Sequence, residues 1–127
     1  MVKAQKIDTE VKKSKSDSIL SINCEEFYRL VLKSNVPVII NFWADWCKQC
    51  NPVKEELEKL TKKYKNKVTF YKVNYDLCPS IISNYQITAL PAVLIYYQGE
   101  PIEKISGAIK TTEYERVIGD VLTRLNN

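Results

Sequence analysis

Two cysteines of the chain, Cys47 and Cys50, have the spacing of a dithiol that can close into a small disulfide ring. Cys47 follows a strongly apolar run and lies at the start of a predicted helix. Unpaired N–H groups and the helix dipole stabilise an anion there, so Cys47 should ionise readily. Since the thiolate is the attacking species in disulfide exchange, we predict an exposed Cys47 as nucleophile. A more buried Cys50 is the predicted resolving cysteine, and the charge of Lys48 should favour the thiolate.

The same spacing also supplies half of many zinc sites. A structural zinc ion would need two further ligands. The sequence has no histidine, and its other two cysteines, Cys24 and Cys78, fall in separate predicted elements. The pattern therefore favours redox chemistry, and we expect neither a metal nor a cofactor.

The composition is that of a soluble globular protein with one hydrophobic core. Of the 127 residues, 45% are hydrophobic and 27% are charged. The absence of histidine excludes Cys–His and Ser–His–Asp catalysis, and a net charge of +4 gives no reason to expect a nucleic-acid partner. The longest apolar run, 36–44, is too short to cross a bilayer, so we expect no membrane association.

Residues 1–18 are rich in Lys, Ser and Asp and are interpreted as a mobile extension before a domain over 19–127. The extension contains no apolar stretch that could serve as a secretion signal. The chain could nevertheless derive from a longer precursor with a targeting peptide. The compartment therefore stays open between the cytoplasm and an organelle.

Helix and strand patterns alternate from residue 19 onward, which predicts an α/β fold with a central mixed sheet flanked by helices on both faces. The run 36–43 has no polar alternation and is typical of a central strand. A hairpin turn over 98–101 should supply an antiparallel edge. The last helix should begin with a capping box of Thr112 and Glu115. Strands are predicted over 19–22, 36–43, 68–73, 92–97 and 102–106, and helices over 24–34, 50–64, 79–85 and from 112 onward.

Two segments carry a family resemblance. Asn41-Phe-Trp-Ala-Asp-Trp-Cys-Lys-Gln-Cys50 resembles the active-site signature of thioredoxins, and Ala89-Leu-Pro-Ala-Val93 is similar to their cis-proline segment. The resemblance covers residues 19–127 and implies a thioredoxin fold with a cis Pro91 beside the dithiol. It also implies that the backbone of Leu90 pairs with an extended substrate segment. The implied apolar docking surface consists of Trp46, Leu90, Pro91, Gly107 and Ala108.

The active site departs from the family pattern at positions that bear on its chemistry. The buried acid thought to shuttle the proton of the resolving cysteine is replaced by Asn41, whose amide cannot accept a proton. Lys72 matches the lysine that usually accompanies this acid. Because the acid is missing here, Lys72 should favour a neighbouring thiolate, lie partly deprotonated or turn toward solvent. Lys48 and Gln49 stand where thioredoxins usually have Gly-Pro. Both the added charge and the lost acid predict a more oxidising potential than that of a typical thioredoxin.

The resemblance implies a thiol–disulfide oxidoreductase that reduces disulfides in protein substrates and is itself restored by a thioredoxin reductase. An oxidase or isomerase of the same fold is one alternative. A binding or adaptor module with weak redox activity is another, because Asn41 replaces the acid. We expect a monomer. Cys24 and Cys78 are interpreted as small, partly buried apolar side chains, with regulatory oxidation or a disulfide-linked dimer as the alternative.

Overall fold

The computed structural model describes residues 19–107 and 110–125. The predicted extension over 1–18 lies outside the described residues. The elements in chain order are β1 (Leu20–Ser21), α2 (Cys24–Glu26), a π-helical turn (Phe27–Val31), β2 (Val38–Trp43), α3 (Cys50–Lys63), β3 (Thr69–Asn74), a 3₁₀ turn (Tyr75–Leu77), α4 (Pro79–Asn84), β4 (Ala92–Tyr97), β5 (Glu100–Ser106) and α5 (Thr111–Leu125).

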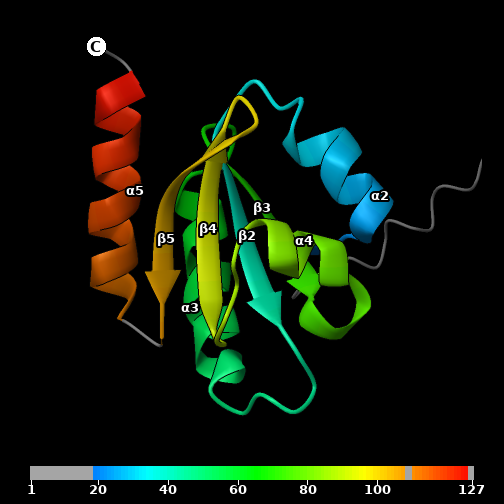
Figure 1. Cartoon of the computed structure of the whole chain (residues 1–127). Coiled ribbons are helices and arrows are strands. Elements are labelled where there is room, and N and C mark those ends of the chain that lie inside the picture. Colours follow the sequence, from blue (N-terminus) through cyan, green and yellow to red (C-terminus); the bar gives the residue numbers. More distant parts are fainter. Residues whose placement is uncertain (1–18, 108–109, 126–127) are drawn as a thin grey trace, which may run out of the picture.

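The five strands form one mixed sheet in the order β1-β3-β2-β4-β5 (Figure 1). β2 is its central strand and runs parallel to β3 but antiparallel to β4. β4 and β5 form the predicted hairpin. Because β2 has hydrogen-bonded neighbours on both sides and helices over both faces, its continuous apolar sequence is buried along its length.

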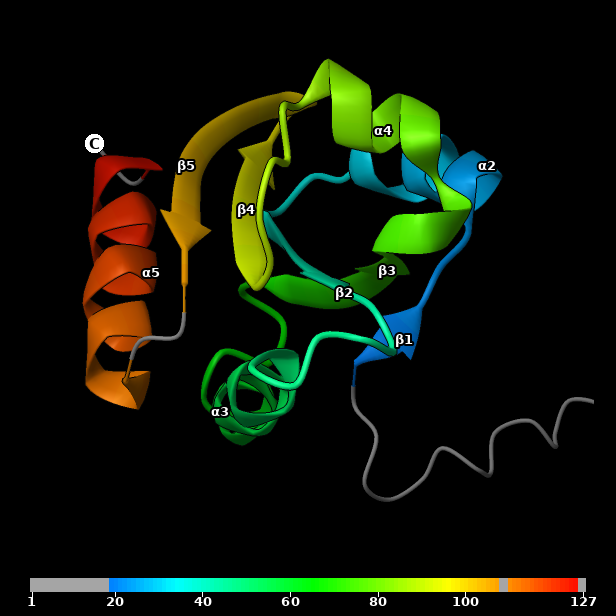
Figure 2. The same ribbon diagram turned by 60° about the horizontal axis from the view of Figure 1, so that its bottom comes forward.

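Helices cover the two faces of the sheet in pairs, α3 and α5 on one face and α2 and α4 on the other (Figure 2). Alternate residues of β2 divide between the two layers, with Ile39 packing under α3 and α5, and Ile40 under α2 and α4. An ion pair of 3.0 Å between Lys63 and Glu115 also joins α3 to α5. The predicted α/β architecture is thereby confirmed.

Most predicted elements are present, and the differences have local causes. The helix predicted over 24–34 ends earlier, because the Ser34 hydroxyl bonds to the backbone of Val36 and turns the chain toward β2. The predicted capping box of Thr112 is wrong. The helix already begins at Thr111, and the amides of residues 113 and 114 donate to the carbonyl of Lys110, so Thr112 lies inside the first turn. No helix among residues 19–107 and 110–125 is long and apolar enough to cross a membrane.

Candidate active site

The C-terminal ends of three strands, β2, β3 and β5, lie beside the N-terminal end of β4. They lie along one edge of the sheet, the edge across which the strands end. In the ladder Trp43 is opposite Asn74, so β2 and β3 finish side by side. β4 is antiparallel to β2, and its first residue, Ala92, therefore lies beside the end of β2 and opposite Ser106 at the end of β5. The segments that follow β2, β3 and β5, and the one that precedes β4, are consequently neighbours although they are far apart in sequence.

The predicted dithiol lies at this edge, and Cys47 and Cys50 are joined in a disulfide with 5.4 Å between their Cα atoms. Cys50 is the first residue of α3, as predicted. Cys47 lies in the preceding turn, where its amide donates to the carbonyl of Ala44 at 3.1 Å. The turn thus brings the two sulfurs together without an interruption of β2 or α3.

The prediction of an exposed Cys47 is wrong for this disulfide state. Cys47 is 5% exposed and Cys50 is 3% exposed, so the two differ little. Cys47 is covered because it is tied to Cys50 and packs in a small apolar cluster with Ala44, Trp43 and Leu90. By contrast, Lys48 between the two cysteines is exposed, and its charge is solvated.

The segment before β4 contributes the second side of the site. The Leu90–Pro91 peptide bond is cis, as the family resemblance implies. The carbonyl of Pro91 accepts a hydrogen bond of 2.9 Å from the amide of Gly107, which fixes the segment to the end of β5. Gly107 has a φ of +85°, a conformation that favours glycine. Ala108, which the resemblance adds to the docking surface, lies outside the described residues.

Trp46 is the most exposed aromatic side chain beside the disulfide, with 61% of its surface accessible. Its indole N–H donates to the carboxylate of Asp76 at 2.9 and 3.2 Å, and its ring meets Tyr75 edge to face at 5.8 Å. Both partners belong to the 3₁₀ turn after β3. Sequence reasoning missed this role of Asp76, because no local pattern links the residue to a tryptophan 30 positions away.

A small cavity lies behind the disulfide, between β2, β3 and α3. It has a volume of about 240 Å³, and Asn41, Cys50, Lys54 and Lys72 are among its lining residues. Asn41 is 1% exposed, and its side-chain oxygen has no hydrogen-bond partner among the described residues. The Lys72 ammonium lies 5.8 Å from the centre of the Trp43 ring. The structure therefore brings Asn41 and Lys72 together next to Cys50.

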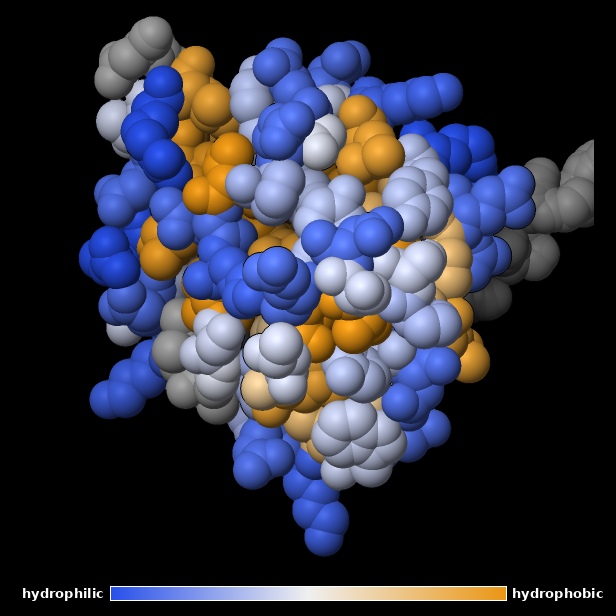
Figure 3. Space-filling model, in the orientation of Figure 1, coloured by the Kyte–Doolittle hydropathy of each residue, from blue (hydrophilic) through white to orange (hydrophobic). Residues whose placement is uncertain are grey.

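The surface around the loop between β2 and α3 is partly apolar and partly hydrophilic. Figure 3 shows apolar and weakly polar atoms gathered where the loop between β2 and α3 lies in Figure 1, with strongly hydrophilic side chains around them. A surface of this kind suits an extended peptide that contributes both apolar side chains and backbone hydrogen bonds.

Cys24 and Cys78 pack in and against the apolar layer as predicted, but the interpretation of them as no more than small apolar side chains is wrong. They form a second disulfide between α2 and the residue before α4. The pairing depends on the parallel neighbours β1 and β3, which bring together two cysteines 54 positions apart. Among the described residues no group of three or more His, Cys, Asp or Glu side chains could hold a metal ion.

Comparison with known proteins places these features in a family. A sequence model of the thioredoxin family matches residues 18–120. The chain is 37% identical over 91 residues to an M-type chloroplastic thioredoxin of Spinacia oleracea, covering 72% of this chain and 50% of that protein. It is 30% identical over 113 residues to a thioredoxin of Mycobacterium bovis, covering 89% of this chain and 97% of that protein.

A third relative, of Mycobacterium leprae, is a bifunctional thioredoxin reductase/thioredoxin that is 31% identical over 107 residues, or 84% of this chain and 23% of that protein. The chain spans about half the length of the spinach relative and a smaller share of the bifunctional one. The family match nevertheless covers the whole sheet from β1 to β5 together with most of α5. The chain therefore belongs to the thioredoxin family.

Proposed function

We propose that the chain is a thiol–disulfide oxidoreductase that acts on disulfides of protein substrates. The observation that carries this proposal is the Cys47–Cys50 disulfide, which lies at the meeting point of the strand ends beside the Leu90–Pro91 segment. An extended substrate can dock against this segment, and the dithiol beside it can exchange electrons with the substrate.

The reduced protein would act in two exchange steps. The Cys47 thiolate attacks one sulfur of the substrate disulfide, that bond breaks, and the other substrate sulfur leaves as a thiolate that takes up a proton. Cys50, deprotonated, then attacks the Cys47 sulfur, the mixed disulfide breaks, and the second substrate thiolate leaves. Two electrons and two protons have passed to the substrate, and Cys47–Cys50 is again the disulfide seen in the structure.

For the docking surface we propose Trp46, Leu90, Pro91, Gly107 and Ala108. Trp46 is exposed and its indole is fixed by the hydrogen bond to Asp76, which supports its role as an apolar contact for the substrate. Leu90 lies two residues before Ala92, the first residue of β4, which supports a role for its backbone in pairing with an extended segment.

The proposed activity has a direct test in the reduction of insulin by dithiothreitol. The wild-type protein should accelerate the reaction, whereas Cys47→Ser should give the rate of dithiothreitol alone, because a hydroxyl cannot form the mixed disulfide. Lys48→Gln serves as a control for changes in the same turn and should keep most of the rate. Equal rates for wild type and Cys47→Ser would contradict the proposal and favour a binding or adaptor module.

The reduction potential of Cys47–Cys50 is expected to lie above about −270 mV, the value of a typical thioredoxin. The positive charge of Lys48 stabilises the thiolate form, and Asn41 provides no carboxylate to oppose it. The measurement is a glutathione titration of a Cys24→Ala/Cys78→Ala variant, in which only this pair can react. Removing the charge with Lys48→Gln should lower the potential by about 10 mV, since an exposed charge has a small effect. In this variant with Lys48 unchanged, a potential at or below about −270 mV would refute the expectation.

Restoring an acid behind Cys50 should accelerate the resolving step. We expect Asn41→Asp to speed release of the mixed disulfide about tenfold, because the new carboxylate can accept the Cys50 proton inside the shared cavity. The same change should lower the free energy of unfolding by about 1–3 kcal/mol, since it buries an ionisable group. Rapid-quench kinetics with a labelled disulfide peptide measures the step. Asn41→Leu has the same size without a base, so equal acceleration by both variants would rule out proton transfer.

For partners, we propose protein disulfides as substrates and a thioredoxin reductase as electron donor. The bifunctional relative supports the second assignment, because its name joins both activities in one protein. We further propose that the chain acts as a monomer in the cytoplasm or an organelle; the matched relatives include both bacterial and chloroplastic proteins.

A further inference from the structure

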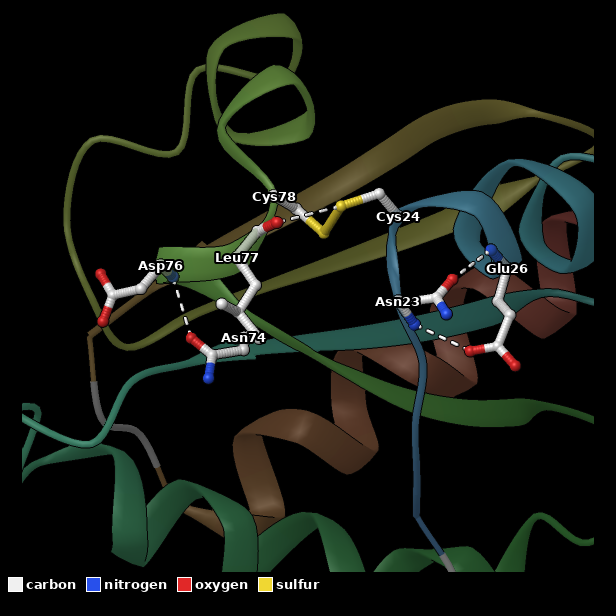
Figure 4. The surroundings of a disulfide bond; sticks show 7 residues. All are labelled: Asn23, Cys24, Glu26, Asn74, Asp76, Leu77 and Cys78. Carbon is white, nitrogen blue, oxygen red and sulfur yellow. Dashed lines mark hydrogen bonds between the residues drawn. A yellow bond between two sulfur atoms is a disulfide. The ribbon is translucent and has the colours of Figure 1, made fainter.

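The second disulfide joins two elements beside the active-site edge (Figure 4). Cys24 begins α2, Cys78 precedes α4, and their Cα atoms are 5.6 Å apart. The two cysteines differ in access. Cys78 is 1% exposed within the apolar layer under α2 and α4, whereas Cys24 is partly exposed. A pocket of about 240 Å³, lined by both cysteines with Asn23, Glu26 and Leu77 among the other residues, adjoins the bond.

From this arrangement we infer that Cys24 and Cys78 form a second redox couple, a reversible disulfide that external dithiols open at the Cys24 sulfur. The inference goes beyond the proposed function and does not depend on it, because it concerns other sulfurs on another pair of elements. The access of Cys24 and the pocket beside it provide the route for an incoming thiolate.

The surroundings of the bond also suit the reduced form. The Cys24 sulfur lies 3.2 Å from the carbonyl oxygen of Leu77, so a Cys24 thiol has an acceptor in place. Asn23 and Glu26 hold the start of α2 independently of the disulfide, since each side chain accepts a bond of 2.8 Å from the backbone amide of the other residue. Cys78 is packed among apolar side chains that accommodate a neutral thiol. The couple can therefore open while α2 stays folded.

The opening reaction balances with a dithiol as reductant. A thiolate of the reductant attacks the Cys24 sulfur, the bond between Cys24 and Cys78 breaks, and Cys78 leaves as a thiolate that takes up a proton. The second thiolate of the reductant then attacks the reductant's other sulfur, which is bonded to Cys24. This step releases Cys24 as a thiolate, which is protonated in turn. The protein gains two electrons and two protons, and the reductant becomes a disulfide. Glutathione disulfide can reverse the reaction as oxidant.

The couple is connected to the substrate surface through one short segment. Cys78 directly follows the 3₁₀ turn whose residue Asp76 accepts the indole hydrogen bond of Trp46. Tyr75 of the same turn contacts the Trp46 ring, and the Asn74 side chain caps the turn at the amide of Asp76 with a bond of 2.9 Å (Figure 4). The closed disulfide anchors the far end of this turn to α2. Opening it frees that end, and we expect Trp46 to become more mobile as a consequence.

The first experiment asks whether the couple is reversible in the folded protein. A Cys47→Ala/Cys50→Ala variant retains only Cys24 and Cys78. It is equilibrated with mixtures of reduced and oxidised glutathione, or with dithiothreitol, and then alkylated with a maleimide. The expected result is at least one added maleimide, on the accessible Cys24, under reducing conditions and none under oxidising conditions, with unchanged circular dichroism. If the bond opens only after denaturant is added, the pair is an inert staple and the inference is overturned.

The second experiment asks whether the couple acts on Trp46. In the same variant, reduction should shift tryptophan fluorescence, and adding Asp76→Ala should abolish the shift while leaving the maleimide result unchanged. A Trp46→Phe variant keeps only Trp43, so it shows how much of the fluorescence change comes from Trp46. No change in tryptophan fluorescence on reduction would overturn the connection.

The two proposals fail separately in these experiments. The maleimide measurement uses a variant without Cys47 and Cys50, so a protein inactive toward insulin can still show the second couple. Conversely, a Cys24–Cys78 bond that never opens leaves the insulin test of Cys47 untouched.

Discussion

Replacing Cys24 and Cys78 together by alanine is expected to lower the free energy of unfolding of the oxidised protein by about 4 kcal/mol. The disulfide closes a loop across 54 positions, and in the chain-entropy model such a cross-link removes many conformations from the unfolded chain. Domains of this size have total stabilities of about 5–15 kcal/mol, so the variant should still fold but with a clearly lower urea midpoint.

The Cys47–Cys50 disulfide provides the matched control for this measurement. It spans only 3 positions, and the same model gives a loss of about 1.5 kcal/mol for Cys47→Ala/Cys50→Ala. Urea unfolding of both double variants under oxidising conditions therefore compares a long loop with a short one in the same protein. Equal losses would show that loop length does not set the stabilisation. Under a strong phosphine reductant, wild type and Cys24→Ala/Cys78→Ala should have similar midpoints.

Replacing Cys50 by serine is expected to reduce insulin turnover at least about a thousandfold and to trap a mixed disulfide on Cys47. Cys50 is held one short turn from Cys47, so its attack on the mixed disulfide is intramolecular. A serine at this position leaves release to dithiothreitol from solution, which lacks this proximity. Mass spectrometry of the variant after reaction with a disulfide peptide should show one adduct.

The comparison with Cys47→Ser decides the roles of the two cysteines. That variant should form no adduct under the same conditions, since the attacking sulfur is missing. The near-equal burial of the two residues in the disulfide state makes this measurement necessary, because exposure alone does not distinguish nucleophile from resolver here. An adduct on Cys50 in Cys47→Ser, with none in Cys50→Ser, would reverse the assignment.

Features encoded by local patterns could be predicted from the sequence. The apolar run that became β2, the hairpin after β4 and the first turn of α3 at Cys50 each depend on neighbouring residues, and each was predicted close to its observed bounds. The cis Leu90–Pro91 bond was anticipated only through the family resemblance, because few X–Pro bonds are cis.

Features that depend on tertiary contacts could not be predicted in this way. The Cys24–Cys78 pairing follows from the placement of β1 beside β3, and the hydrogen bond from Trp46 to Asp76 joins two loops at the edge of the sheet. The burial of Cys47 likewise comes from packing against Trp43 and Leu90, which a local pattern does not contain. Such contacts have no sequence period by which they could be recognised.

The meeting of strand ends at one edge also has a consequence for the order of folding. β2 pairs with β4 across roughly fifty intervening residues, whereas β4 and β5 are joined by a short hairpin. Long-range pairings of this kind close late, because their loop entropy must be overcome first. During synthesis the dithiol segment therefore emerges well before the Leu90–Pro91 segment that completes its surroundings. The proposed docking surface is complete only with the finished sheet, and a fragment that ends before Leu90 has the cysteines but lacks Leu90, Pro91 and Gly107.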